Sequence, residues 1–145
     1  MIMLLKPLGI VASSLLLLSA QALATPQPII EELLTANRTL GGRVVAYPEG
    51  TPEMRVYRIK IPVGAKIPLH IHPSPVVVIV EQGRLSNVRI VDGVEVSDII
   101  ATGGGFLEDH PEPHYVINKG SIPAVSLVTF ASVEGIPNQI SVKPD

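Results

Sequence analysis

The sequence contains no cysteine and no tryptophan, and it has few aromatic residues of any kind. Without cysteine, a disulfide framework, a thiolate nucleophile and a thiolate metal site are excluded. Aromatic residues make up only 3% of the chain, so a platform of stacked side chains for nucleic-acid bases is not supported. The formal net charge of −2 is too small to indicate nucleic acid or an anionic membrane surface as a partner.

The N-terminal segment has the composition of a secretory signal peptide. Lys6 provides a short positive region, residues 8–18 are apolar, and an A-x-A cleavage pattern ends at Ala24. The apolar stretch is shorter than the roughly 20 residues that span a bilayer, so cleavage is favoured over a membrane anchor. We predict a signal peptide over residues 1–24 and one exported domain over residues 25–145, periplasmic or secreted, without stable membrane insertion after cleavage.

The mature region is predicted to be all-β with one short N-terminal helix. Residues 29–37 place apolar side chains at positions 29, 30, 33 and 34, which lie on one face of a helix. After them, runs rich in valine and isoleucine are interrupted by glycine and proline about every eight to twelve residues, a spacing typical of a sandwich or barrel. The predicted strands are residues 44–47, 55–61, 67–71, 76–81, 85–91, 94–100, 114–118, 124–130 and 140–142.

Glycines mark the turns between these strands. Asp92-Gly93 favours a two-residue hairpin turn, and Gln82-Gly83 has a similar position between two strands. The run of three glycines at 103–105 indicates a tight bend or a close approach of two backbones.

The four histidines form two pairs, His70 with His72 and His110 with His114. Side chains at i and i+2 of an extended strand point to the same face, so His70 and His72 can act together. Apolar runs and turns separate this pair from His114, so the chain can fold back and bring a third imidazole to it. Three convergent imidazoles suit a divalent transition metal (Fe, Zn, Ni, Mn or Cu, the identity left open) better than magnesium or calcium.

The residues around these histidines resemble the two signatures of the cupin family. The matches to the first signature, G-x5-H-x-H-x3-E-x6-G, are Gly64, His70, His72 and Gly83. Its glutamate position falls on Val76. The matches to the second signature, G-x5-P-x-G-x2-H-x3-N, are Gly103, His114 and Asn118. The proline and the second glycine of that signature have no counterpart, and the resemblance covers residues 56–130.

The resemblance implies a single antiparallel jelly-roll barrel over residues 25–145, with a metal ion held inside one open end. Its ligands would be His70, His72 and His114, with Val76 where a carboxylate is expected. A three-histidine set is neutral, so a divalent ion keeps its full charge and attracts anionic ligands more strongly. Such a set also leaves open coordination positions, as catalytic metal sites do. The residues predicted to be structural are Gly64, Gly83 and Asn118.

Three-histidine cupins are known among oxygen-using iron enzymes that act on chelating substrates. The resemblance therefore implies a metal-dependent, dioxygenase-like enzyme for a small chelating or anionic molecule, and a homodimer. The alternative is an exported module that binds a metal or a small ligand without catalysis, which the missing carboxylate favours. A metal-free structural barrel is a third hypothesis.

Other residues are candidates for pocket residues or a substitute ligand. Glu112 lies two residues before His114 and would share its face if the strand began that early, although the flanking prolines favour a loop. His110 is either a solvated loop residue or a ligand or acid–base group at the rim of the site. Tyr57 either belongs to the core or lines the mouth of the pocket. Val76 is expected to face the pocket from the glutamate position.

Overall fold

The computed structural model describes residues 25–143, so the predicted signal peptide lies outside the described residues. Residues 31–143 belong to one unit, while residues 25–30 are assigned to a separate unit and have no regular secondary structure. Within the described part of the chain, no helix has the length and apolar character needed to cross a membrane.

The described residues form strands of two to ten residues each. The strands are β1 (Pro52–Ile61), β2 (Lys66–Ile71), β3 (Val76–Gln82), β4 (Arg84–Val91), β5 (Val94–Ala101), β6 (Gly105–Glu108), β7 (His114–Ile117), β8 (Ala124–Val133) and β9 (Ile140–Ser141).

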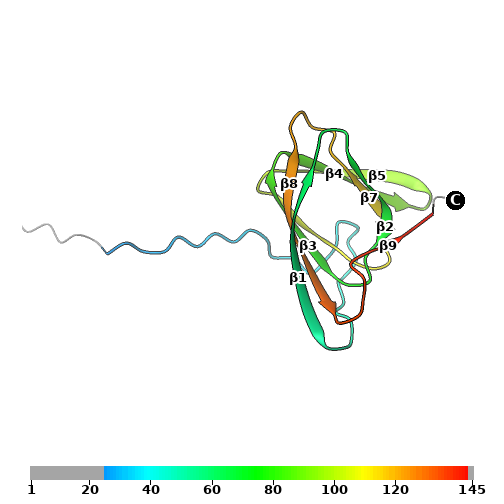
Figure 1. Ribbon diagram of the computed structural model, residues 1–145, viewed down its shortest axis with the longest axis horizontal. Coiled ribbons are helices and arrows are strands. Elements are labelled where there is room, and N and C mark those ends of the chain that lie inside the picture. The colour runs from blue at the N-terminus through cyan, green and yellow to red at the C-terminus, as the bar shows by residue number, and fades with distance from the viewer. Residues whose placement is uncertain (1–24, 144–145) are drawn as a thin grey trace, which may run out of the picture. The chain divides into compact units, whose positions relative to one another are not determined.

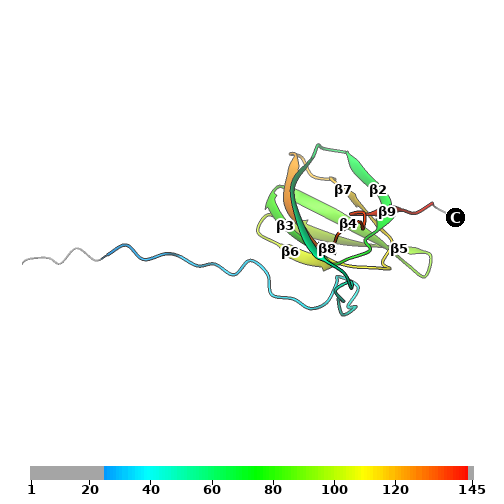
Figure 2. The ribbon, with the colours of Figure 1, turned by 60° about the horizontal axis from the view of Figure 1, so that its bottom comes forward.

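These strands make two antiparallel sheets, with the orders β1-β8-β3-β6 and β5-β4-β7-β2-β9. Figures 1 and 2 show β1, β8 and β3 on one side of the domain and β2, β7 and β9 on the other. Buried and less buried residues alternate along β3 and β8, as expected when one face of a sheet packs on a core. The all-β prediction is confirmed.

The apolar part of the core lies between the two sheets and consists of aliphatic and phenylalanine side chains. One cluster joins residues of both sheets, since Ile61 and Val80 pack with Leu85 and Val116. A second cluster contains Val76, Val78, Phe106, Val128 and Phe130. Removal of this apolar surface from water is the main stabilising contribution to such a fold.

The predicted helix over residues 29–37 is wrong, because none of the described residues is helical. Isolated helices shorter than about 12–15 residues are only marginal in water and depend on packing of their apolar face. Here that packing is missing, since Leu33 on the predicted face remains 52% exposed. Local periodicity was therefore not sufficient.

Two further differences concern strands. Residues 44–47 were predicted as a strand, but only a single bridge between Arg38 and Val44 forms. The N–H of Ala46 donates to the Asp109 carboxylate instead of a neighbouring strand. Conversely, β6 was not predicted, because the three glycines before it indicated only a bend. A Cβ atom on Gly105 would lie 2.5 Å from Ile79 Cδ1, so this glycine does mark a close approach between β6 and β3.

Asn118 connects three segments of the chain at the end of β7. Its buried amide donates to the carbonyls of Ile61 and Ile122, and its Oδ1 accepts from the N–H of Gly120. Gly83, which follows β3, has φ = 73°, and a Cβ there would lie 2.9 Å from the Pro123 carbonyl oxygen.

We expect Asn118→Ala to lower the free energy of unfolding by about 2–4 kcal/mol, because it leaves buried carbonyl groups without donors. Urea denaturation of the variant and the wild type measures this loss. Asn118→Asp keeps the acceptor for Gly120 but loses both donors, so it should recover little of the stability. A variant as stable as the wild type would contradict a structural role for this side chain.

Candidate metal centre

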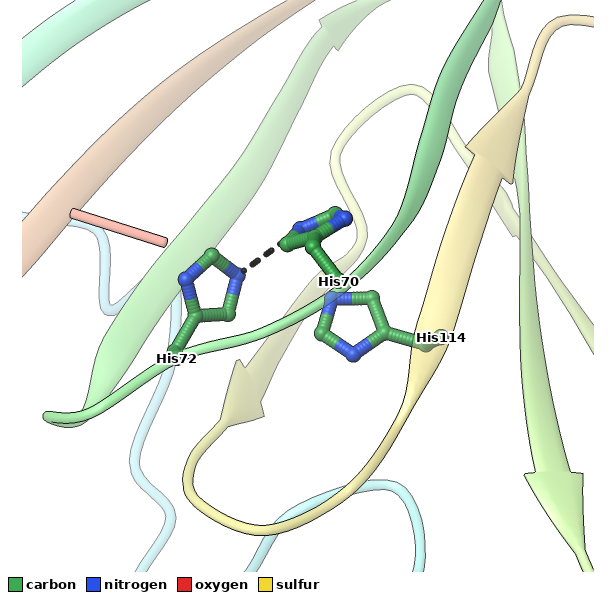
Figure 3. Close-up of side chains that lie close together, drawn as sticks. All are labelled: His70, His72 and His114. Atoms are coloured by element: carbon green, nitrogen blue, oxygen red, sulfur yellow. Dashed lines mark hydrogen bonds between the residues drawn. The ribbon is translucent and has the colours of Figure 1, made fainter. Parts of the chain in front are cut away.

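The pairing of β2 with β7 places His70 directly opposite His114. The register of this pair shifts between Ile67 and His70, where Pro68 cannot donate a hydrogen bond to the neighbouring strand. His72 lies just beyond the end of β2 on the same side as His70, as the alternation of an extended chain requires. Figure 3 shows the three imidazole rings turned toward one another.

The three rings are buried and close together. The three residues are at most 3% exposed, and the ring centroids are 4.4 Å apart for His70 and His114, 4.8 Å for His70 and His72, and 5.1 Å for His72 and His114. One nitrogen of each ring lies within 4.8 Å of the corresponding nitrogens of the others. Three nitrogen donors are therefore available to one ion.

Hydrogen bonds fix which nitrogen of each ring carries the proton. Nδ1 of His70 donates to the Pro68 carbonyl at 2.7 Å, Nδ1 of His72 to the Asn138 carbonyl at 2.7 Å, and Nδ1 of His114 to the Glu112 carbonyl at 2.8 Å. Because a carbonyl oxygen only accepts, each neutral ring keeps its lone pair on Nε2. Orientation of a ring by its second nitrogen is typical of histidine metal ligands.

The Nε2 atoms of His70 and His72 are close enough to share a cation. Nε2 of His70 and Nε2 of His72 are 3.2 Å apart, and two lone pairs at that distance repel unless a metal ion or a proton lies between them. A buried set of three imidazole nitrogens matches the donors preferred by first-row transition metals. The residues present therefore fit a divalent metal.

The structure adds Glu108, which sequence reasoning missed. Its Oε1 lies 3.0 Å from His114 Nε2 and its Oε2 lies 3.3 Å from His72 Nε2. The amide of Asn87 on β4 donates to the same carboxylate. Both polar side chains are nearly fully buried. In the sequence, Glu108 is distinguished only by its position directly after the apolar pair Phe106-Leu107. This segment was not predicted to be a strand, so Glu108 was not a candidate ligand.

Burial and the neighbouring charges shift the pKa values of this group of side chains. Burial lowers the pKa of His70 to about 4, so this ring is neutral near pH 7. Burial alone would raise the pKa of Glu108, but the facing imidazoles of His114 and His72 outweigh it and hold this pKa below its usual range. Burial likewise opposes protonation of His114, and the Glu108 carboxylate overcomes it and raises the pKa of that ring.

In metal-free protein, His70 should make stability depend on pH. Its pKa in the folded state, about 4, lies below the ordinary value of 6.5, so its contribution is present above pH 6.5 and is lost as the pH falls toward 4. A shift of this size corresponds to about 3 kcal/mol. Urea denaturation with a chelator measures the loss. His70→Asn, which keeps a donor for the Pro68 carbonyl but cannot be protonated, should show a smaller loss over that range; an equal loss would contradict the assignment.

A small cavity opens beside the histidines between the two sheets. Its volume is about 50 Å³, several times the roughly 10–15 Å³ that one water molecule needs. The hydroxyl of Ser126 in its wall is buried and has no hydrogen-bond partner among the described residues. The other lining residues are Ile59, Ile61, Ile67, His70, His72, Val78, Leu85, Phe106, Glu108, Val116, Val128, Phe130 and Gln139.

The remaining candidates lie outside the histidine cluster. The Glu112 carboxylate accepts a hydrogen bond from Thr39 Oγ1 at 2.7 Å, so Glu112 contacts the cluster only through its main-chain carbonyl, while its charge contributes to the raised pKa of His114. His110 is exposed. Tyr57 is 44% exposed and packs edge-on against Phe130, with the ring centroids 5.7 Å apart. Val76 is fully buried in the apolar core.

Comparison with known proteins identifies the fold. No family model and no curated protein sequence matches the chain. Among solved structures, an oxalate oxidase in complex with the substrate analogue glycolate aligns with a TM-score of 0.53 and 23% identity over 61% of this chain. The oxalate decarboxylase of Lactobacillus farciminis aligns with a TM-score of 0.53 and 21% identity over 61%. The fold is the cupin fold.

A third cupin neighbour is the polyketide cyclase RemF of Streptomyces resistomycificus, with a TM-score of 0.54 and 16% identity over 66% of this chain and 64% of its own. The chain spans only 46% of the oxalate oxidase and 26% of the oxalate decarboxylase. These cupin neighbours carry different activities, so they establish the architecture here, while chemistry must be argued from the side chains in the site.

Proposed function

We propose that this cupin domain is a metal-dependent, dioxygenase-like enzyme that acts on a small chelating or anionic molecule. The observation that carries the proposal is the set of three buried Nε2 atoms, each with its lone pair directed into the same space. His70, His72 and His114 would hold a divalent ion (Fe, Zn, Ni, Mn or Cu). A bound ion supplies Lewis acidity and a template for its ligands, and iron adds redox chemistry with dioxygen.

The chain itself would orient the ligands and exclude water. The carbonyls of Pro68, Asn138 and Glu112 fix the three rings, so little reorganisation is needed when an ion binds. Apolar side chains of both sheets surround the site, and in such surroundings each charge interaction is stronger than in water. Because the three rings are neutral, a divalent ion held by them keeps a net positive charge even with one carboxylate beside it, and this charge attracts an anionic oxygen or sulfur of the substrate.

The cavity supports a small substrate. A volume of about 50 Å³ accommodates a few heavy atoms, and its wall is mainly aliphatic. No lysine or arginine is among the described residues that line the cavity. A substrate with a second carboxylate away from the ion would therefore meet no positively charged side chain there. The arrangement favours a small enolate or thiolate whose charge lies at the metal end and whose remaining atoms are apolar; a catecholate would have to extend beyond this cavity.

We also propose that the protein is exported and that it forms a homodimer. The sequence before Thr25 supports export to the periplasm or the exterior after cleavage at Ala24. The resemblance to cupins supports a homodimer. The mass of the purified mature protein and its size by light scattering test these two points directly.

Oxygen consumption tests the enzymatic proposal. Protein loaded with one equivalent of Fe(II) should take up dioxygen with at least one member of a panel of diketones, thiols and catechols, and His114→Ala should not. Absence of turnover with every panel member and every first-row metal would contradict the enzyme hypothesis.

A non-catalytic binding module is the second candidate. Apart from the histidine and glutamate side chains at the metal end, the polar side chains in the cavity wall are those of Ser126 and Gln139. Neither is an efficient general base at neutral pH, which favours binding without catalysis. Equilibrium dialysis that shows tight metal retention, together with no turnover of any substrate, would support this alternative.

A further inference from the structure

Glu108 reaches the histidine cluster from a strand that contributes none of the three rings. It is the last residue of β6 and lies directly opposite Val76 of β3. Residues directly opposite across an antiparallel pair project from the same face of a sheet. Val76 faces the core, and the Glu108 carboxyl group therefore enters the space between the sheets, where this residue is only 7% exposed.

The environment of this carboxylate favours a positive charge beside it. Among the described residues it has no lysine or arginine partner; its charged or polar neighbours are His72, His114 and Asn87. The Nδ1 atoms of the two histidines already donate to carbonyls, so whenever these rings are neutral their Nε2 lone pairs face the carboxylate oxygens. Nε2 of His114 lies 3.0 Å from Oε1 but makes no hydrogen bond. A buried carboxylate facing lone pairs is unfavourable unless a positive charge lies among them, and either a metal ion or a proton on an Nε2 atom supplies it.

The separations of the Glu108 oxygens from two of the three rings match those of atoms that share one ion, while the donor atoms that all lie within 4.8 Å of one another are those of the three histidines alone. Ligand atoms about 2.1 Å from a common metal lie about 3.0 Å apart in an octahedral arrangement and about 3.4 Å apart in a tetrahedral one. The distances here are 3.0 Å from Oε1 to Nε2 of His114, 3.3 Å from Oε2 to Nε2 of His72, and 3.2 Å between Nε2 of His70 and Nε2 of His72.

We propose that Glu108 is the fourth protein ligand of the metal, and that Asn87 positions it. This inference rests on the proposed function, because it requires the three imidazoles to hold an ion. The carboxylate that sequence reasoning sought at Val76 comes from the residue paired with it on the neighbouring strand. With Glu108 bound, the protein reduces the formal charge of a divalent site from +2 to +1, which lowers the cost of holding the ion in an apolar interior.

Metal affinity measured with Zn(II) against a competing chelator tests the proposal. Glu108→Gln should weaken binding by about 100-fold or more, since even outer partners of metal ligands contribute 10–100-fold. Asp109→Asn is a matched control. It removes the charge of an adjacent, equally buried carboxylate whose recorded partners are the N–H groups of Ala46 and His110, and it should leave the affinity unchanged.

Exchanging the two paired residues gives a variant that should recover metal affinity. The double variant Val76→Glu, Glu108→Val moves the carboxylate to the opposite strand at the same level of the sheet, and it should bind Zn(II) more tightly than Glu108→Gln. Equal affinities of Glu108→Gln and the wild type would overturn this proposal while leaving the three-histidine site intact. A wild-type protein that binds no metal would instead remove the proposed function as well.

A measurement on the wild type covers the case in which the variants do not fold. The infrared difference spectrum recorded on Zn(II) addition should contain a shift of carboxylate stretching bands, and labelling glutamate with ¹³C should move those bands. A difference spectrum with histidine bands and no glutamate band would overturn the assignment of Glu108 as a ligand.

Discussion

Replacing His72 with alanine is expected to abolish stoichiometric metal binding. His72 Nε2 is 3.2 Å from His70 Nε2 and 3.3 Å from the Glu108 carboxylate, so its loss removes a central donor and leaves a carboxylate without this neighbour. The affinity should fall by well over about 100-fold, because loss of an outer partner alone costs 10–100-fold. Elemental analysis after equilibrium dialysis of protein purified without a histidine tag measures the bound metal.

His110→Ala is the matched control for this experiment. It removes the fourth histidine of the chain, which is exposed and lies outside the cluster, so the metal content should remain that of the wild type. Equal metal contents in His72→Ala and the wild type would show that any bound ion lies elsewhere.

The second large effect is stabilisation by the metal. An ion that binds the folded chain and not the unfolded one adds about 4 kcal/mol when its free concentration is a thousand times the dissociation constant. For a domain of this size that corresponds to a rise in Tm of more than about 10 °C. Differential scanning calorimetry at pH 7 with and without Zn(II) measures the shift.

The same calorimetric experiment has an internal control. Addition of Zn(II) to His72→Ala should leave its Tm nearly unchanged, whereas His110→Ala should show the full rise. A wild-type protein whose Tm does not respond to any divalent transition metal would contradict a metal site in the core of the domain.

The sequence predicted those features that depend on short-range patterns. The i, i+2 spacing of His70 and His72 places both rings on one side of an extended chain, and the apolar runs identify most strands of both sheets. Gly83 and Asn118 lie at the turns to which the motif assigned them, where φ and buried hydrogen bonds restrict the residue type. Each of these signals lies within a few residues of the feature it predicts.

The features that sequence reasoning missed depend on pairing between distant segments. Glu108 reaches the histidines only because β6 pairs with β3, and nothing within the four residues of β6 indicates that partner. The helix predicted over residues 29–37 also depended on distant residues. Its apolar periodicity was present locally, but a helix that short is stable only when its apolar face packs against another part of the chain. Glu112, the candidate ligand closest to His114 in the sequence, instead accepts a hydrogen bond from Thr39 through its carboxylate.

Anomalous X-ray diffraction from crystals of the mature protein grown with Zn(II) tests the central claim most directly. We expect one strong peak about 2.0–2.2 Å from Nε2 of His70, His72 and His114, with a Glu108 oxygen at a similar distance. A structure at full metal exposure without a peak among these rings, or with the ion bound only at the surface, would contradict the metal centre itself.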